Sequence, residues 1–339
     1  MHRSEITIDL GAVRRNTARL LDALAGAELW AVVKADGYGH GALDVSRAVL
    51  EAGATALCTA TVPEAIAVRR DLREARIIVM GPADDEEIAQ AREARLEVCI
   101  SGGRLPEGLP IHLKLDTGMG RYGFRELPEP SENTVGLMTH LATADTDPAF
   151  AEEQVARFRE AATPYPHLTH HVANSAAALR LPSTRFDAAR CGIALYGLSP
   201  FGDDPADDGL APVLSWRSHL AQVKLVQPGQ STGYGRHFVA EEPTWIGLVP
   251  VGYGDGFRRD MTGTLVLVAS ERCRAVGTVS MDSFAVELPG ELQPGEQVTL
   301  IGDGLLAEEH ARVAGTINYE IACGINSSGE RAAWKVVDA

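Results

Sequence analysis

The stretch of sequence that decides the fold runs from Leu29 to Gly41 and reads LWAVVKADGYGHG. An apolar run ends at Lys34, a glycine-rich segment follows, and the next segment, 42–51, has the composition of a helix. A buried strand followed by a turn and a helix is the unit from which parallel α/β folds are built. The sequence therefore predicts that Lys34 lies at the carboxyl end of a parallel strand.

The same unit recurs along the first two-thirds of the chain. Eight apolar runs alternate with helical or turn segments, at 29–34, 56–60, 76–80, 96–100, 111–115, 135–140, 168–173 and 191–196. Eight such units favour a closed (β/α)8 barrel of the TIM type. An open doubly wound sheet is the alternative, because the connections 101–110 and 124–134 are short or rich in proline. A parallel crossover usually needs about a dozen residues or more, so we expect both connections to lack a regular helix.

Three helix starts are marked by residues that cap helices. Thr61 precedes Pro63 and Glu64, the acidic segment 84–87 opens a second helix, and Asp147 precedes Pro148 in a third. Small polar side chains accept hydrogen bonds from the first free N–H groups, and proline is well tolerated in the first turn. These signals predict a helix over 65–73 with Thr61 as its N-cap, a second that opens with the acidic segment 84–87 and runs to about Arg95, and a third that opens at Asp147 and runs through Arg159.

Beyond about Gly209 the pattern changes. Short β-like runs separated by turn residues occupy 214–226, 245–251, 263–269, 274–279, 283–288 and 297–301, followed by a helical segment at 306–314 and a last run at 334–337. We therefore predict two domains, a barrel at 1–209 and a mostly β C-terminal domain at 210–339. The segment 203–208 is the expected linker.

Composition limits the classes of partner. The chain has 339 residues, with 31 Lys and Arg against 46 Asp and Glu, and its net charge is −15. That excess of acid argues against a nucleic-acid or anionic-membrane partner, because both require cationic patches. It leaves room for an anionic small ligand, since a pocket can be positive inside a negative protein.

The cysteines and the N-terminus bear on the compartment. No C-x-x-C pair occurs among Cys58, Cys99, Cys191, Cys273 and Cys323, which indicates mostly buried thiols in a reducing environment. The first ten residues contain no apolar segment of the kind found in secretory signals, and no stretch approaches the length of a membrane span. We expect a soluble, cytoplasmic protein.

Polar residues follow several of the predicted strands, and in a barrel these positions carry catalytic side chains. They are Lys34, Lys114, His140, Asn174 and Arg190. Burial of the Lys34 stem would favour a neutral, nucleophilic amine, although a lysine whose ammonium group simply reaches solvent is the alternative. The glycine-rich segment after Lys34 suits a phosphate, because backbone N–H groups can approach an anion there.

At this point the sequence resembles a known family. Segment 31–41 is similar to the pyridoxal-phosphate attachment signature of the alanine racemase family. Further family motifs match in order at 112–121, 139–145, 171–175, 190–197, 233–235, 252–256, 280–282 and 317–320. The resemblance covers nearly the whole chain, and it implies an eight-stranded barrel followed by a β domain, as the pattern of strands also indicates.

The resemblance implies the reaction. The protein would interconvert L-alanine and D-alanine, supplying D-alanine for peptidoglycan, with Lys34 forming a Schiff base to pyridoxal 5'-phosphate. Racemisation removes a proton from one face of the amino acid and returns it on the other, which requires two acid–base groups. Lys34 would serve one face and Tyr234 the other. His140 and Arg190 are the candidate cations that would help the Tyr234 phenol to ionise.

The resemblance also implies how the cofactor is held. Arg190 would face the pyridine nitrogen, and because arginine stays protonated it would leave that nitrogen unprotonated. The phosphate and the ring would be bound by Tyr38, His140, Asn174, Ser175, Gly192, Ile193 and Tyr319. Asn174 is equally readable as the N-cap of the helix that follows it. No metal site is implied.

Substrate recognition follows from the same resemblance. Arg121 and the backbone of Met281 would bind the substrate carboxylate. Lys114 matches a lysine that is often carbamylated in the family and would then orient Arg121, although an ion pair of Lys114 with Asp116 or another acid is the alternative. Tyr253 and Tyr319 would form a narrow gate. Because Tyr234, Tyr253 and Met281 reach the other subunit's barrel in the family, a homodimer with shared active sites is implied.

Some positions depart from the family pattern, and other functions stay open. Thr278 and Ser280 stand where relatives commonly have arginine and cysteine in the substrate entryway, whereas Asp145, His171 and Arg259 of that entryway are retained. A pyridoxal-phosphate racemase of broad specificity is the nearest alternative. A decarboxylase is disfavoured by Arg190 and the tyrosine gate, and a non-enzymatic cofactor carrier is disfavoured by the second domain.

Overall fold

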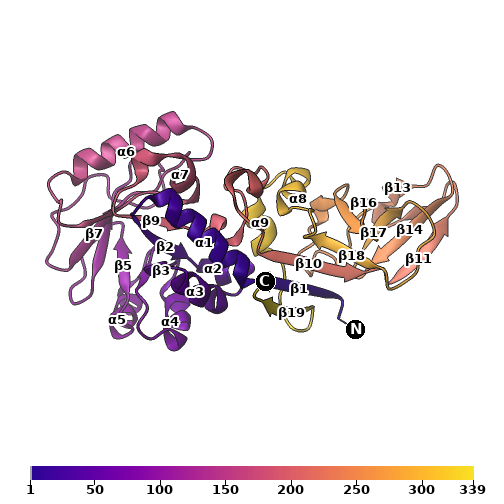
Figure 1. Ribbon diagram of the computed structural model, residues 1–339, viewed down its shortest axis with the longest axis horizontal. Coiled ribbons are helices and arrows are strands. Elements are labelled where there is room, and N and C mark those ends of the chain that lie inside the picture. The colour runs from indigo at the N-terminus through magenta and orange to yellow at the C-terminus, as the bar shows by residue number, and fades with distance from the viewer. Residues whose placement is uncertain (1) are drawn as a thin grey trace. The chain divides into compact units, whose positions relative to one another are not determined.

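The computed structural model describes residues 2–339, which form two compact units (Figure 1). The barrel unit comprises residues 13–201 and 205–211, and the β unit comprises the described residues up to Ala12 together with 202–204 and 212–339. Among the described residues no helix is long and apolar enough to cross a membrane.

Eight parallel strands close the barrel. They are β2 (Glu28–Val32), β3 (Ala56–Thr59), β4 (Ile77–Val79), β5 (Glu97–Ile100), β6 (Ile111–Lys114), β7 (Thr134–Met138), β8 (Thr169–His171) and β9 (Ala188–Cys191). Each strand pairs with the next, and β9 returns to β2 through the pairing of Arg190 with Trp30. The predicted TIM-type barrel is confirmed, and the open sheet is wrong.

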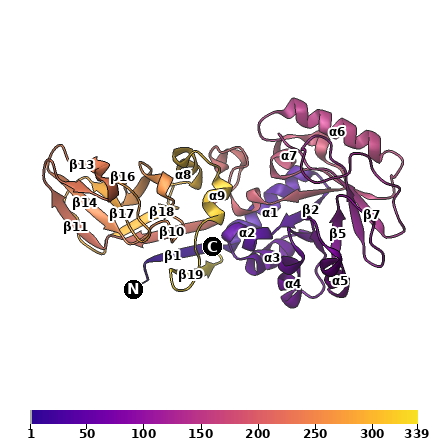
Figure 2. The ribbon, with the colours of Figure 1, turned by 180° about the vertical axis from the view of Figure 1, so that it is seen from behind.

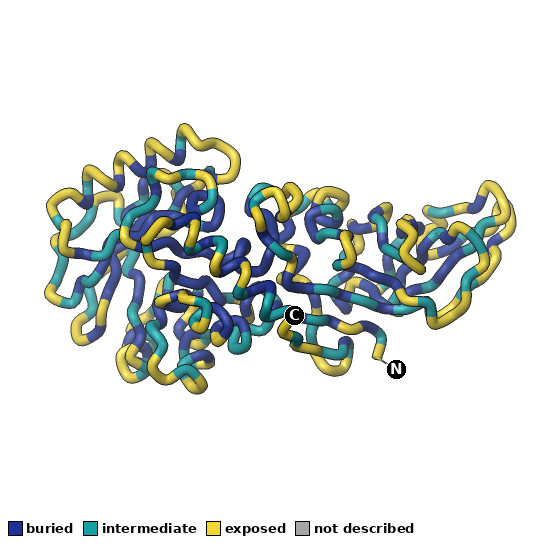
Figure 3. Tube along the Cα trace, in the orientation of Figure 1, coloured by how far each residue is buried: buried dark blue, intermediate teal, exposed yellow. Residues whose placement is uncertain are grey.

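Helices cover the outside of the barrel. They are α1 (Leu10–Leu24), α3 (Ala42–Glu51), α4 (Val62–Asp71), α5 (Asp85–Glu93), α6 (Pro148–Ala162) and α7 (Ser175–Arg180). The short segment α2 (Lys34–Gly39) is a left-handed turn after β2 and not a covering helix. Helices α3, α4 and α5 lie side by side along the barrel (Figures 1 and 2). The strands are buried, whereas the helices carry exposed residues on their outer faces (Figure 3). Each helix buries apolar side chains only on the face that packs against the strands, because burial there removes hydrocarbon from water.

The predicted helix starts and the two missing helices are confirmed. Thr61 caps α4 and Asp84 caps α5, each in a reciprocal capping box, and Asp147 caps α6. No α-helix lies between β5 and β6, or between β6 and β7, in this fully described part of the chain.

The eighth strand differs from its predicted position. The apolar run 191–196 was expected to form it, but β9 ends at Cys191 and the segment Ile193–Tyr196 is a 3-10 helix, η2. The strand escaped detection because Arg190 interrupts its apolar pattern. Arg190 is nevertheless buried, since backbone carbonyls accept its hydrogen bonds.

The β unit is built on a nine-stranded sheet in the order β11-β14-β17-β16-β15-β18-β10-β1-β19. Its strands are β1 (Ser4–Asp9), β10 (Leu214–His219), β11 (Gln222–Val226), β14 (Thr244–Val249), β15 (Leu265–Val268), β16 (Glu271–Val276), β17 (Phe284–Leu288), β18 (Gln297–Ile301) and β19 (Ala332–Val337). A two-stranded ribbon, β12 (Ser231–Thr232) and β13 (Phe238–Val239), and the helices α8 (Ala307–Ala314) and α9 (Asn318–Cys323) complete it.

Four features of the β unit, including the β12–β13 ribbon, were not expected from the sequence. The apolar run 214–226 contains two strands, β10 and β11, and α9 was not recognised. Strand β1, which the division at 209/210 assigned to the barrel, pairs antiparallel with β10 and parallel with β19. The alternating burial of its residues suits a sheet strand with one face in the core.

Candidate active site

Polar side chains gather where the barrel strands end. Lys34 directly follows Val33 at the end of β2, Lys114 is the last residue of β6, and His140 follows β7. Asn174 lies just beyond β8, and Arg190 is the penultimate residue of β9. The closed barrel brings these ends together, which is the placement expected for catalytic residues.

Lys34 enters an unusual turn. The four residues Ala35–Tyr38 all have left-handed backbone angles, with φ between 50° and 61°. Such angles cost about 1–2 kcal/mol for each residue other than glycine, so the turn requires external support. The Glu64 carboxylate supplies it, because Oε1 accepts from the Ala35 N–H at 2.8 Å while Oε2 accepts from the N–H groups of Ala60 and Thr61 at 2.8 and 3.2 Å.

The turn delivers Tyr38 into a cradle of hydroxyl and backbone groups. Tyr38 is buried, and a Cβ atom at Gly192 would lie 2.4 Å from its hydroxyl oxygen. The Ser175 hydroxyl, also buried, accepts hydrogen bonds from the N–H groups of Gly192 at 3.0 Å and Ala194 at 3.4 Å. Hydroxyls and backbone N–H groups at the starts of α7 and η2 are the donors that suit a phosphate. The residues present therefore fit the phosphate of a cofactor.

Asn174 acts as a helix cap. Its side-chain oxygen accepts from the N–H of Ala177 at 3.0 Å, at the start of α7. The reading of Asn174 as an N-cap is therefore confirmed, and the cap fixes the position of the neighbouring Ser175.

Arg190 is buried and held by backbone carbonyls. Its Nη1 donates to the carbonyl of His171 at 2.6 Å, and its Nη2 donates to the carbonyl of Thr139 at 2.8 Å. The rings of His171 and His140 present Nδ1 to Nη1 and Nη2 at 2.9 and 3.3 Å. Nε–H donates to no group among residues 2–339, so one donor of the guanidinium stays available to a ligand.

Lys114 is a buried cation beside other cations. Burial and the charges of Arg121 and Arg190 lower the pKa of Lys114 to about 8, and no carboxylate of the described chain lies within ion-pair distance of it. Asp116 instead accepts from the N–H groups of Gly118, Met119 and Gly120. The expected alternative, a Lys114–Asp116 ion pair, is therefore wrong.

His140 is also affected by this concentration of positive charge. Burial, followed by the charges of Arg190, Arg121 and Lys114, lowers the pKa of His140 well below its usual value. The imidazole is therefore neutral at physiological pH, so the expectation that His140 is a cation able to help Tyr234 to ionise is wrong. The acidic protein thus contains a local positive region, which suits an anionic ligand.

The remaining predicted residues belong to the β unit, and three of them are exposed. Tyr234 is 72% exposed, Met281 51% and Tyr253 45%. Tyr319 is half-buried in α9. The Tyr234 carbonyl accepts from the Thr278 hydroxyl at 2.8 Å, so the residue at 278 fixes the backbone of the tyrosine.

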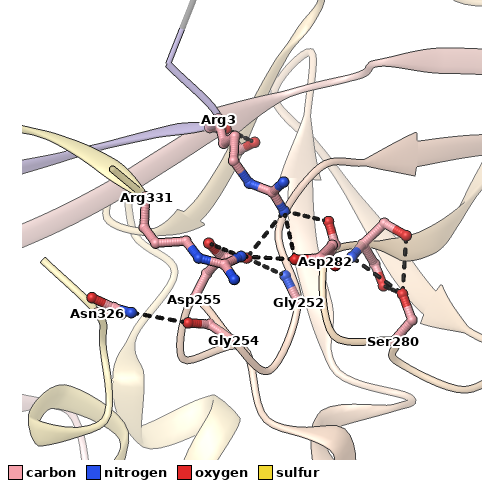
Figure 4. A network of polar contacts seen from close by, with 10 residues as sticks. Arg3, Gly252, Gly254, Asp255, Ser280, Asp282, Asn326 and Arg331 are labelled. Atoms are coloured by element: carbon pink, nitrogen blue, oxygen red, sulfur yellow. Dashed lines mark hydrogen bonds and ion pairs between the residues drawn. The ribbon is translucent and has the colours of Figure 1, made fainter. Parts of the chain in front are cut away.

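A buried carboxylate joins the loops that carry Tyr253 and Met281 (Figure 4). Asp255 accepts from the Gly252 N–H at 2.8 Å and forms ion pairs with Arg3 and Arg331, and both arginines also pair with Asp282, the residue after Met281. The Tyr253 N–H donates to the Ser280 carbonyl at 3.0 Å, and the Gly254 N–H donates to the Met281 carbonyl at 2.9 Å. Hydrogen bonds and ion pairs therefore hold the two loops together.

The sequence did not reveal that Glu64 contributes to the barrel site, and it led to a wrong position for His171. Glu64 follows Thr61 by three residues, which signals a capping box, but only the fold brings its second oxygen to Ala35. His171 was assigned to the substrate entryway, and that assignment is wrong. Its side chain is fully buried in the barrel core and contacts Arg190 and His112.

Comparison with known proteins agrees with this architecture. The family model described as "Alanine racemase, N-terminal domain" matches residues 8–200, and the model "Alanine racemase, C-terminal domain" matches residues 213–333. The chain is 39% identical to alanine racemase 1 of Bacillus subtilis, over 94% of this chain and 90% of the relative. It is also 39% identical to an alanine racemase of Ligilactobacillus salivarius, over 94% of each.

Solved structures give the same result. The alanine racemase of Streptomyces lavendulae superposes with a TM-score of 0.91 at 34% identity, covering 100% of this chain and 98% of the other. The biosynthetic alanine racemase of Pseudomonas aeruginosa has a TM-score of 0.91 at 35% identity, covering 99% and 100%.

Proposed function

The chain belongs to the alanine racemase family, and on that premise we propose that it interconverts L-alanine and D-alanine with pyridoxal phosphate as its cofactor. The observation that carries the proposal is the arrangement at one end of the barrel, where Lys34, the cradle of Tyr38, Ser175 and Gly192, and the Arg190 guanidinium lie together. We further propose that the enzyme is cytoplasmic and supplies D-alanine for peptidoglycan.

Each end of the cofactor has a matching set of residues. When bound, pyridoxal phosphate takes up the electron pair left behind when an amino acid loses its α-proton. Lys34 Nζ would hold the group covalently. Tyr38, Ser175 and the N–H groups of Gly192 and Ile193 would bind the phosphate, with Asn174 fixing Ser175 and with Tyr319 as a further hydroxyl donor.

Arg190 would meet the pyridine nitrogen with its available Nε–H, and His140 would lie against the ring. Because a guanidinium donates and does not give up its proton near neutral pH, the nitrogen would stay unprotonated. A less positive ring withdraws electrons less strongly. This arrangement would limit side reactions such as transamination.

Substrate binding would fall to Arg121, with the backbone of Met281. The lowered pKa of Lys114 favours its free amine, and a free amine is the form that combines with carbon dioxide to give a carbamate and a proton. A carbamate at Lys114 would place an anion among Arg121 and Arg190, where an ammonium ion is disfavoured. The absence of an acidic partner in the described chain supports this modification.

The second acid–base group would come from a partner subunit. The exposure of Tyr234, Tyr253 and Met281 in one chain supports a homodimer in which these side chains enter the partner's barrel site. Lys34 and Tyr234 would then exchange the α-proton from opposite faces. Tyr253 and Tyr319 would restrict the entrance to a small side chain, which favours alanine over the broad-specificity alternative.

The experiment has two parts. Borohydride reduction of the protein loaded with pyridoxal phosphate, followed by peptide mapping, should place the label on Lys34, and Lys34→Ala should take up none. Tyr234→Phe should still be labelled at Lys34 but should no longer racemise alanine. In deuterated water, one of the two alanine enantiomers should no longer take up deuterium at its α-carbon. Labelling of another lysine would refute the cofactor assignment, and normal racemisation by Tyr234→Phe would refute the two-base scheme. A panel that includes serine and lysine measures specificity.

A further inference from the structure

A continuous chain of hydrogen bonds crosses the barrel core beneath the candidate site. Arg190 Nη1 lies 2.9 Å from Nδ1 of His171, and Nε2 of His171 lies 2.9 Å from Nδ1 of His112. Nε2 of His112 lies 2.7 Å from the carboxylate of Glu97. The chain links Arg190, near the carboxyl end of β9, to Glu97, the first residue of β5 at the opposite end of the barrel.

The groups at the two ends of this chain of hydrogen bonds, Arg190 and Glu97, determine which ring nitrogens carry protons. Arginine has donors only, so Nδ1 of His171 must accept from Arg190 and its proton must sit on Nε2. That proton is donated to Nδ1 of His112, whose own proton therefore also sits on Nε2 and is donated to Glu97. Any other placement in neutral imidazoles leaves two donors or two acceptors facing each other. A second proton on either ring would place N–H against N–H.

Glu97 is held as the accepting end. Arg76 donates to both of its oxygens, from Nε at 2.7 Å and from Nη2 at 2.9 Å. These bonds and the bond from His112 lower the pKa of Glu97 to about 2 despite its burial. Burial lowers the pKa of both His112 and His171, which agrees with neutral rings between a carboxylate and a guanidinium.

The surrounding core leaves room for the two rings and restricts them. A Cβ atom at Gly136 would lie 2.3 Å from Nδ1 of His112, so the glycine makes the His112–His171 contact sterically allowed. The Trp30 ring packs against His171 at 4.5 Å between centroids, and the Arg76 guanidinium lies 4.6 Å from the centre of the Trp30 ring. These contacts oppose rotation of the imidazoles.

We propose that Glu97 is a positioning residue for Arg190, acting through His112 and His171, which it fixes as two neutral imidazoles with the proton on Nε2. The Nδ1 lone pair of His171 then always faces the guanidinium, together with the carbonyls of Thr139 and His171. This orientation leaves Nε–H of Arg190 directed to the ligand. The inference deepens the proposed function and rests on it only for the statement that Arg190 meets the cofactor.

The first test needs neither cofactor nor substitution at Glu97. Two-dimensional nitrogen-15 spectra of histidine-labelled protein without cofactor distinguish the two imidazole tautomers, and the variants His112→Gln and His171→Gln assign the signals. Both rings should show protonated Nε2 and unprotonated Nδ1. A protonated Nδ1 in either ring would overturn the proposal, whatever the protein catalyses.

The second test compares Glu97→Gln with Glu93→Gln, a matched change of an exposed glutamate on α5. A glutamine at 97 has one acceptor oxygen for the three N–H groups of Arg76 and His112, so its NH2 group must face one of these donors and the uniform Nε2–H signals should be lost. We expect kcat to fall about tenfold through misplacement of Arg190, with KM for alanine within about twofold and more transamination per racemisation. Glu93→Gln should change neither the spectra nor the rates.

The outcomes distinguish the positioning role of Glu97 from the proposed function of the protein. Retention of both tautomers and of the wild-type reaction ratio in a folded Glu97→Gln protein would overturn the positioning role. If Glu97→Gln fails to fold, the tautomers of the unmodified protein still decide the proposal. A protein with the expected tautomers that binds no pyridoxal phosphate would refute the proposed function and leave the proton arrangement standing.

Discussion

At Gly192 the absence of a side chain leaves the room that the Tyr38 hydroxyl occupies. The backbone N–H of the same residue donates to Ser175, so one position both admits the tyrosine and holds the serine. A hydrogen bond to a charged group contributes about 1.5–3 kcal/mol. Displacement of even one of these hydroxyls should therefore be measurable as weaker cofactor binding.

We predict that Gly192→Ala lowers affinity for pyridoxal phosphate about 10-fold to 100-fold, the loss of one such bond. The new Cβ would lie 2.4 Å from the Tyr38 oxygen and displace it. Titration of cofactor-free protein, followed by absorption, measures the change. Gly102→Ala is the control, because a Cβ at Gly102 has no atom of the described chain within 4 Å. Equal affinities in the two variants would disprove this account of the cradle.

At the scale of elements, the left-handed turn and helix α4 depend on each other. Glu64 belongs to the first turn of α4, yet it holds the backbone of Ala35 beside Lys34. The carboxylate accepts hydrogen bonds from three N–H groups, one after the end of β2 and two after the end of β3. The strain of the turn is therefore balanced by an anion that a helix start also favours.

Glu64→Gln should lower stability by about 0.5–1.5 kcal/mol, because an amide has one acceptor oxygen and one of the three N–H groups, which are exposed or half-buried, loses its protein partner. It should also reduce borohydride-trapped cofactor at Lys34. Glu87→Gln is the matched control: Glu87 occupies the same capping-box position of α5 but accepts only from Asp84, and glutamine serves there as well. Denaturation by urea measures both variants. If the two lose equal stability, Glu64 has no role beyond the helix cap.

At the scale of the whole molecule, the polar groups buried in the barrel unit make stability depend on pH. Burial lowers the pKa of His40 to about 4, and it also lowers the pKa of His112 and His171. Burial in the low-polarity core disfavours the charged form of each ring more than its hydrogen bonds favour that form. Acid should therefore destabilise the folded barrel.

The sign follows from proton uptake. Below about pH 6.5 an unfolded histidine binds a proton that these folded histidines do not, so stability falls as pH falls, by about 1.4 kcal/mol per pH unit for each ring. Glu97, with its pKa lowered to about 2, adds a further loss below about pH 4.5. Urea denaturation of the barrel between pH 8 and 4.5 measures the slope. Substitution of the exposed His167 by glutamine should leave the slope unchanged, and a level profile would contradict the prediction.

The sequence by itself predicted most strands and helices of the barrel and named most residues of the candidate site. Apolar runs of strand length, capping residues such as Thr61 and Asn174, and connections too short for a helix are local properties, so they can be recognised without knowing the fold. The motifs around Lys34, Lys114 and Arg190 likewise identify the family from residues near one another in the chain.

Only the tertiary structure decided the rest, because the deciding contacts join residues far apart in the chain. Arg190 can be buried inside β9 only because backbone carbonyls at the ends of other strands accept its hydrogen bonds. The segment β1 becomes a sheet strand only when β10 and β19 pair with it on either side. Glu64 and Glu97 look like ordinary surface glutamates in the sequence. Folding brings Glu64 to the backbone beside Lys34. It places Glu97 at the end of a buried chain of hydrogen bonds, where the low polarity of the surroundings strengthens each bond.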